Sequence, residues 1–152
     1  MATIIPAARA FIEAGPFGHI VTLNPDGTPH VSLAWVGVDG DELVWSTFAD
    51  QRKIANLRRD PRITVSFQAK EPDGGFLFPY LVAQGSATIT EGGALEVMDR
   101  LAPAYIGADR FPNREVPPGL TVRVRVDRLY GAGTWREHEP AQAADADERT
   151  AR

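Results

Sequence analysis

The chain has 152 residues, of which 43% are hydrophobic and 24% are charged, and this composition predicts a single soluble domain with an apolar core. The net charge of −4 argues against bulk nucleic-acid binding, and the absence of cysteine excludes disulfides, thiolate zinc sites and cysteine nucleophiles. Neither a long apolar stretch nor a secretion-signal pattern is present, so we expect a cytoplasmic protein with no membrane association.

Turn residues divide the chain into short elements. The alternation of apolar and polar residues between these turns predicts six strands, at 18–23, 28–38, 42–48, 62–69, 79–90 and 120–130. Helices are expected at 3–14, from about 50 after the third strand, and at 91–105. Asp26-Gly27 is expected to form a tight hairpin turn, and Gly85 marks either a bulge in the fifth strand or a place where another group packs close to the backbone. Segment 107–119 is expected to be an irregular loop.

Six strands with this little helix favour a mostly β fold, an antiparallel barrel, because closure removes exposed sheet edges. A sandwich is the alternative. The barrel domain is expected to span 1–136, and segment 137–152, rich in Ala, Asp, Glu and Arg without aromatic residues, is expected to be a disordered tail.

Segment 46–62 carries the strongest functional pattern. Ser46 and Thr47 end a strand, and a helix is expected to begin with Asp50 as its N-cap. Ile54 and Leu57 give that helix one apolar stripe, and three polar residues near its start fall off the stripe: Arg52, Lys53 and Asn56. Hydroxyls, a basic pair and a helix N-terminus together predict a phosphate site. The alternative is a solvated basic helix face.

The strand at 28–38 alternates between two kinds of residue. One face is apolar, with Val31, Leu33 and Trp35, and the other is small or polar, with His30, Ser32 and Ala34. His30 is either a functional residue that donates a proton or a half-exposed strand residue. The three histidines lack metal-ligand spacing, so no metal is expected.

The order of these motifs resembles the FMN-binding split-barrel superfamily, typified by pyridoxamine 5′-phosphate oxidase. The resemblance rests on NPDGTP at 24–29, VSLAW at 31–35, LVWST at 43–47, RKIANL at 52–57 and DPRI at 60–63. The resemblance covers residues from about 8 to 135. The compact length, the Lys-x-x-Asn-Leu helix and the ending at 126–135 are most similar to the F420-dependent, or deazaflavin-dependent, reductases.

This resemblance implies a six-stranded antiparallel split barrel and a homodimer with cofactor sites at the subunit interface. It implies that Lys53 pairs with the cofactor phosphate, with Arg52, Asn56, Ser46 and Thr47 around it. It also implies that the strand from Pro29 to Trp35 runs under the cofactor ring and contacts it largely through backbone groups. The residues implied as cofactor contacts at this strand are Pro29, Ser32, Leu33, Ala34 and Trp35.

The expected function is an F420-dependent reductase that transfers a hydride to a small conjugated substrate, because in such enzymes the cofactor carries the chemistry. Two alternatives remain open: an FMN-binding oxidoreductase of the pyridoxamine-phosphate-oxidase type and a non-catalytic cofactor carrier. FMN and F420 share a ribityl phosphate, so a lysine that binds this phosphate does not distinguish the two cofactors. The residues that contact substrate depend on how 70–78 and 107–119 fold.

Overall fold

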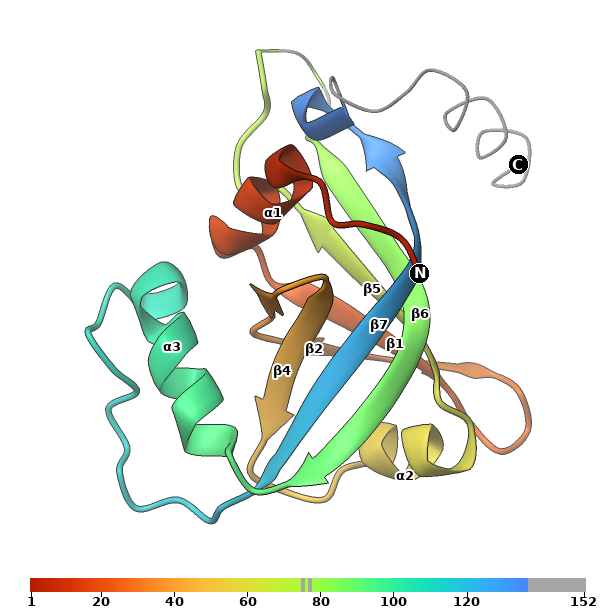
Figure 1. The fold of residues 1–152 in the computed structure, drawn as a ribbon, viewed down its shortest axis with the longest axis vertical. Coiled ribbons are helices and arrows are strands. Elements are labelled where there is room, and N and C mark those ends of the chain that lie inside the picture. The colour runs from red at the N-terminus through yellow and green to blue at the C-terminus, as the bar shows by residue number, and fades with distance from the viewer. Residues whose placement is uncertain (75, 77, 137–152) are drawn as a thin grey trace.

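A computed structural model of the chain describes residues 1–74, 76 and 78–136 (Figure 1). The tail predicted at 137–152 lies outside these residues. The helices are α1 (Pro6–Glu13), α2 (Arg52–Arg59) and α3 (Ala94–Ile106), followed by a short 3-10 helix η1 (Thr134–Arg136). The strands are β1 (Gly18–Leu23), β2 (Pro29–Ala34), β3 (Gly37–Asp39), β4 (Glu42–Thr47), β5 (Arg62–Gln68), β6 (Tyr80–Glu91) and β7 (Leu120–Ala132).

The strands form one antiparallel sheet in the order β2-β1-β5-β6-β7-β4-β3. The sheet curls into a barrel, and in the described part of the chain no ladder joins the two end strands, β2 and β3. The barrel is therefore split. The sheet has seven strands and not the six that the sequence predicts.

The additional strand arises because the segment predicted as one strand at 28–38 is divided at Trp35 and Val36. β2 pairs with β1, whereas β3 pairs with β4 at the other end of the sheet. The backbone N–H of Val36 donates to the Tyr105 hydroxyl of α3 at 2.9 Å, instead of to a neighbouring strand. Gly37 is packed so closely that a Cβ there would lie 2.6 Å from the Leu101 side chain. α3 therefore determines where the segment breaks.

The inner faces of the strands form the core. Its largest fully buried side chains include Trp45, Phe67, Ile20, Leu43 and Leu81. The core extends to α1 and η1 at one end of the barrel, and α2 lies at the opposite end (Figure 1). β6 and β7 form the longest ladder, which shifts register between Gln84 and Gly85, so the predicted bulge is confirmed.

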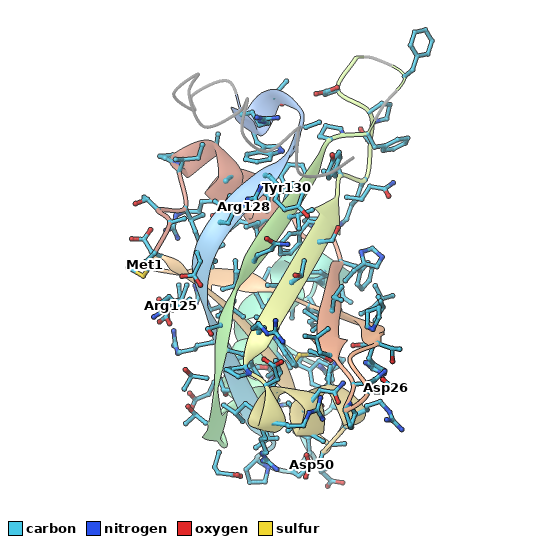
Figure 2. The ribbon with its side chains drawn as sticks, turned by 90° about the vertical axis from the view of Figure 1, so that its right-hand side faces the viewer. Met1, Asp26, Asp50, Arg125, Arg128 and Tyr130 are labelled. Atoms are coloured by element: carbon cyan, nitrogen blue, oxygen red, sulfur yellow. The ribbon has the colours of Figure 1, made fainter. Side chains whose placement is uncertain are left out.

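The outer surface of the sheet is more polar. Figure 2 looks onto β7, β6 and β5, where Arg128 lies over the Tyr130 ring, 5.4 Å from its centroid. β2 is the exception, because Val31 and Leu33 are 58% and 56% exposed. None of the helices in the described ranges is long and apolar enough to cross a membrane.

Candidate functional site

The split in the barrel borders the second half of β4. β3 pairs only with residues 42–44 of β4, so residues 45–47 have no partner strand on that side in the described structure. β2 forms the other border of the split, because its only ladder is with β1. α2 follows β4 in the chain and lies at this end of the barrel (Figure 1).

Lys53, in the first turn of α2, points into this end of the barrel. The residue is 5% exposed, and its Nζ lies 5.0 Å from the centroid of the Trp45 ring. No carboxylate or hydrogen-bond acceptor contacts this ammonium among the described residues, and burial lowers the Lys53 pKa. A buried cation without a counter-ion is costly, and the ring offsets only part of the cost. The position therefore fits an anionic ligand.

Asn56 lies one turn after Lys53 and is also buried. Its side-chain amide donates to Thr22 Oγ1 at 3.0 Å and to Asn24 Oδ1 at 3.1 Å. These bonds attach α2 to β1 and to the hairpin that follows it. The sequence pattern placed Lys53 and Asn56 off the buried stripe, and the structure corrects this, because the helix face toward the barrel includes both residues together with Ile54 and Leu57.

Three buried polar atoms near the split have no hydrogen-bond partner within the described structure: His30 Nδ1, Ser32 Oγ and Trp45 Nε1. His30 is paired directly with Thr22 across β1 and β2, so both side chains lie on the same face. The contact between Thr22 and Asn56 connects this face to the Lys53 side of α2. Buried polar atoms are normally satisfied, so these three atoms indicate a ligand or solvent that completes them.

The outer face of α2 carries the remaining basic residues. Arg52 is exposed in the first turn, next to Lys53. Arg58 lies 3.5 Å from the carboxylate of Asp50 and 3.7 Å from that of Glu91. The helix begins at Arg52 with Gln51 as its N-cap and no side-chain capping bond, so the prediction of Asp50 as N-cap is wrong. Its carboxylate pairs with Arg58 instead of with the first backbone N–H groups.

The other predicted site residues are not all brought together. Ser46 donates to the Ala94 carbonyl at 3.3 Å, on the face of β4 opposite to Trp45. Thr47 is buried on the inner face, and its hydroxyl donates to the Ala49 carbonyl at 2.9 Å. In β2, Ala34 faces inward with His30 and Ser32, whereas Pro29 and Leu33 face outward. Trp35 follows β2 and stacks on Tyr105, with ring centroids 5.2 Å apart.

The arrangement fits a phosphate group at Lys53, near the N-terminus of α2, with Arg52 exposed in the same turn. A helix N-terminus and a buried lysine without a counter-ion among the described residues are each favourable to a multiply charged oxyanion. The described residues contain no group of three or more His, Asp or Glu side chains that could hold a metal ion. The family profile described as pyridoxamine 5′-phosphate oxidase matches residues 4–131 of the chain.

The chain belongs to the pyridoxamine 5′-phosphate oxidase family. Solved structures agree with this fold. A protein described as an F420 reductase is 24% identical, with a TM-score of 0.66, over 80% of this chain and 94% of that one. A conserved hypothetical protein from Mycobacterium tuberculosis is 24% identical, with a TM-score of 0.69, over 92% and 89% of the two chains.

A heme binding protein from Mycobacterium smegmatis is 21% identical, with a TM-score of 0.64, over 88% of this chain and 55% of that one. No curated protein sequence matches the chain. These neighbours share the split barrel of the pyridoxamine 5′-phosphate oxidase family, and their described ligands differ, so the shared fold does not select one cofactor.

Sequence reasoning missed two contributors to this site. Thr22, which accepts the bond from Asn56, was not distinguished from other strand residues. The contact of the Trp45 ring with the Lys53 ammonium was not anticipated from the sequence either. Nothing in the spacing of β4 and α2 reveals that contact, because it depends on the angle at which the helix crosses the barrel end.

Proposed function

We propose that this protein is an F420-dependent oxidoreductase that transfers a hydride between reduced deazaflavin and a small conjugated organic substrate. The observation that carries the proposal is Lys53, a buried residue whose ammonium has no counter-ion among the described residues, in a chain that belongs to the pyridoxamine 5′-phosphate oxidase family. The negative charge of a bound ribityl phosphate would balance the positive charge of the Lys53 ammonium. The likeness to the F420 reductase supports the choice of cofactor.

Lys53 and Arg52 hold the cofactor phosphate in this proposal. Asn56 keeps α2 in position through its bond to β1, and Thr47 is buried at the end of β4. Ser46 shapes the outer side of β4 through its bond to Ala94. Lys53 provides a point charge and Arg52 a planar fork, so the pair is suited to several phosphate oxygens at once.

In this proposal β2 would hold the cofactor ring. Pro29, Ser32, Leu33, Ala34 and Trp35 would contact the ring largely through backbone groups, because β2 is an end strand of the sheet and pairs only with β1 in the described part of the chain. The bound cofactor would supply the hydride, and the chain would orient it. His30 is the candidate proton donor, since its Nδ1 is buried on β2 and has no hydrogen-bond partner among the described residues.

The proposal includes a homodimer with two cofactor sites at the interface. Val31 and Leu33 support it, because they are large apolar side chains that stand more than half exposed on the border of the split. A second copy that covers β2 would bury both residues and close the cofactor site from outside.

An FMN-binding oxidoreductase of the pyridoxamine 5′-phosphate oxidase type is the second candidate, because FMN carries the same phosphate and the family profile bears that oxidase's name. A carrier that binds cofactor without turnover is the third. The test is a titration of the cofactor-free protein with F420 and with FMN, followed by intrinsic fluorescence. Preferential F420 binding supports the proposal, and preference for FMN moves the protein to the second candidate.

Lys53→Ala and Lys70→Ala form a matched pair for this titration. The chain has only these two lysines, and Lys70 is exposed and remote from α2. We expect Lys53→Ala to lose about 1.5–3 kcal/mol of cofactor binding, or roughly 10–150-fold in Kd, and Lys70→Ala to lose none. If Lys53→Ala and Lys70→Ala bind the cofactor with equal affinity, the cofactor phosphate does not bind at Lys53.

A further inference from the structure

A chain of polar side chains joins α2 to the hairpin between β1 and β2. Asn56 of α2 donates from its side-chain amide to Asn24 Oδ1 at 3.1 Å, and the amide nitrogen of Asn24 donates to Thr28 Oγ1 at 3.1 Å. Thr28 is the residue directly before β2. Asn24 therefore lies between α2 and the start of β2, with one side-chain hydrogen bond to each.

Both amides in this chain have a fixed orientation. Arg59 donates to Asn56 Oδ1 at 3.4 Å, and a guanidinium has donors but no acceptor. The Asn56 oxygen therefore faces Arg59, and its NH2 group faces Asn24 and the Thr22 hydroxyl of β1. Asn24 in turn presents its oxygen to Asn56, which leaves its own NH2 group for Thr28. The position of Asn24 thus requires an acceptor on one side and a donor on the other.

The hairpin holds the far end of the chain. The Thr28 hydroxyl donates to the Asp26 carboxylate, which also accepts the Thr28 backbone N–H at 3.0 Å. Because a hydroxyl has only one proton to donate, the Thr28 oxygen can only accept from Asn24. The direction of every hydrogen bond between α2 and the start of β2 is thereby set.

This chain connects the two halves of the proposed cofactor site. Lys53, which holds the phosphate in the proposed function, lies one turn before Asn56 on the buried face of α2. Pro29, the first residue of the strand that would hold the ring, follows Thr28 directly. A phosphate and a ring in one molecule have a limited separation, so a site for both needs α2 and β2 at a matching distance.

We propose that Asn24 is a positioning residue that sets the separation between the helix for the cofactor phosphate and the strand for the cofactor ring. This inference rests on the proposed function, because it concerns the two halves of the same site. Asn24 acts through Asn56 on α2 and through Thr28 on β2. Its replacement therefore weakens a ligand that spans both halves and spares a ligand that occupies only the phosphate half.

The test measures the Kd of F420, of FMN and of inorganic phosphate for the full chain by intrinsic fluorescence. Inorganic phosphate fills only the phosphate half, whereas either cofactor spans both. For the cofactor that wild type binds more tightly, we expect Asn24→Ala to raise the Kd about three- to tenfold, the effect of a lost hydrogen bond. The Kd of inorganic phosphate should stay within about twofold of wild type.

Thr28 provides a second pair of variants on the same chain. Thr28→Val keeps the shape of the side chain without the hydroxyl, and we expect a cofactor loss similar to that of Asn24→Ala. Thr28→Ser retains the hydroxyl and should keep the wild-type Kd. Asn113→Ala is the matched control, because Asn113 bonds the Glu115 backbone N–H within its own exposed loop. Its cofactor Kd should stay within about twofold of wild type, and circular dichroism reports whether each variant is folded.

A wild-type cofactor Kd in Asn24→Ala would overturn the inference. Equal losses for the cofactor and for inorganic phosphate would also overturn it, since they would show that Asn24 supports only the phosphate half. A loss in Thr28→Ser as large as that in Thr28→Val would refute the part of the Thr28 hydroxyl. A loss in Asn113→Ala equal to that in Asn24→Ala would refute the specific position of Asn24.

Backbone NMR of the cofactor-free chain separates this inference from the proposed function. The contacts that link Thr28 to α2 in the described structure run through Asn24. We expect Thr28→Val to shift the amide signals of Asn56 and Arg59 in wild type but not in the Asn24→Ala background. If wild type binds neither cofactor, the proposed function fails, and these signals still decide whether Asn24 couples α2 to β2. Shifts that require Asn24 support the coupling, and shifts that are absent or independent of Asn24 refute it.

Discussion

Replacement of Lys53 by methionine should stabilise the unliganded protein and weaken cofactor binding. Methionine has a similar unbranched stem and no charge, so it fills the space over Trp45 without a buried ammonium. Most substitutions of a buried residue destabilise a protein, and an increase in stability at a binding residue is therefore a distinctive result.

The magnitude follows from two opposing contributions. A desolvated ion without a partner costs several kcal/mol, and Lys53 is 5% exposed with no counter-ion in the described structure. The Trp45 ring returns about 0.5–2 kcal/mol through its contact with the ammonium. We therefore expect Lys53→Met to raise the free energy of unfolding by about 1–3 kcal/mol, which corresponds to a few degrees in Tm for a chain of this size.

The assay is urea unfolding of the cofactor-free protein, with Lys70→Met as the control. Lys70 is exposed, so its replacement should change the free energy of unfolding by less than about 0.5 kcal/mol. Addition of F420 should reverse the order of the variants, because wild type gains more stability from binding. A loss of stability in Lys53→Met without cofactor would refute the reasoning, since it would show that the ammonium is already satisfied.

The pH dependence of the free energy of unfolding provides a second check on whether Lys53→Met is stabilising. Burial lowers the Lys53 pKa in the folded state below the 10.5 of an exposed lysine. Between the folded and unfolded pKa values the unfolded chain binds more protons, so the stability of wild type rises with pH there relative to Lys53→Met. The advantage of the methionine variant should therefore be greatest at neutral pH and should shrink as the pH approaches 10.5.

Three further predictions concern other parts of the chain. The hydrogen bonds from Arg62 lower the pKa of Asp60 to about 2, and Arg62→Gln should return the carboxyl toward 3.8, as followed by carbon NMR; an unchanged midpoint would contradict the pairing. Gly85→Ala should destabilise the fold by about 1–3 kcal/mol in urea unfolding, because its Cβ would lie 1.9 Å from the Arg125 carbonyl oxygen, whereas Ser86→Ala should have little effect. Sedimentation at micromolar concentration should show a dimer that Leu33→Asp dissociates, and a wild-type monomer would remove the shared-site proposal.

Local sequence signals predicted most of the elements. The apolar alternation in β1, β5 and β7 and the Asp26-Gly27 turn depend on neighbours a few residues away, so they are readable in one dimension. The helix boundaries were less well predicted: the first helix begins at Pro6 and not at residue 3, and α3 begins at Ala94 and not at residue 91. The ends of a helix depend on hydrogen bonds of its terminal backbone groups, and the spacing of apolar residues does not indicate these bonds.

β2 shows where alternation alone is insufficient. The sequence correctly separates its two faces, but it does not say which face meets the core. Apolar Val31 and Leu33 face outward, and the smaller or polar Ser32 and His30 face the barrel. An end strand of a sheet is less constrained than a central strand in which of its faces it turns toward the core. In β2 the register with β1 determines that His30 and Ser32 face the barrel.

The sequence by itself determined the mostly β fold, the order of the motifs and the basic segment around Lys53, because these are patterns of neighbouring residues. Only the tertiary structure decided that Lys53 points inward over Trp45, that Val36 leaves its strand to bond Tyr105, and that the Phe111 ring contacts the Trp35 ring. These contacts join residues up to 76 positions apart, as between Trp35 and Phe111. Their geometry depends on how separate elements pack, which no local pattern encodes.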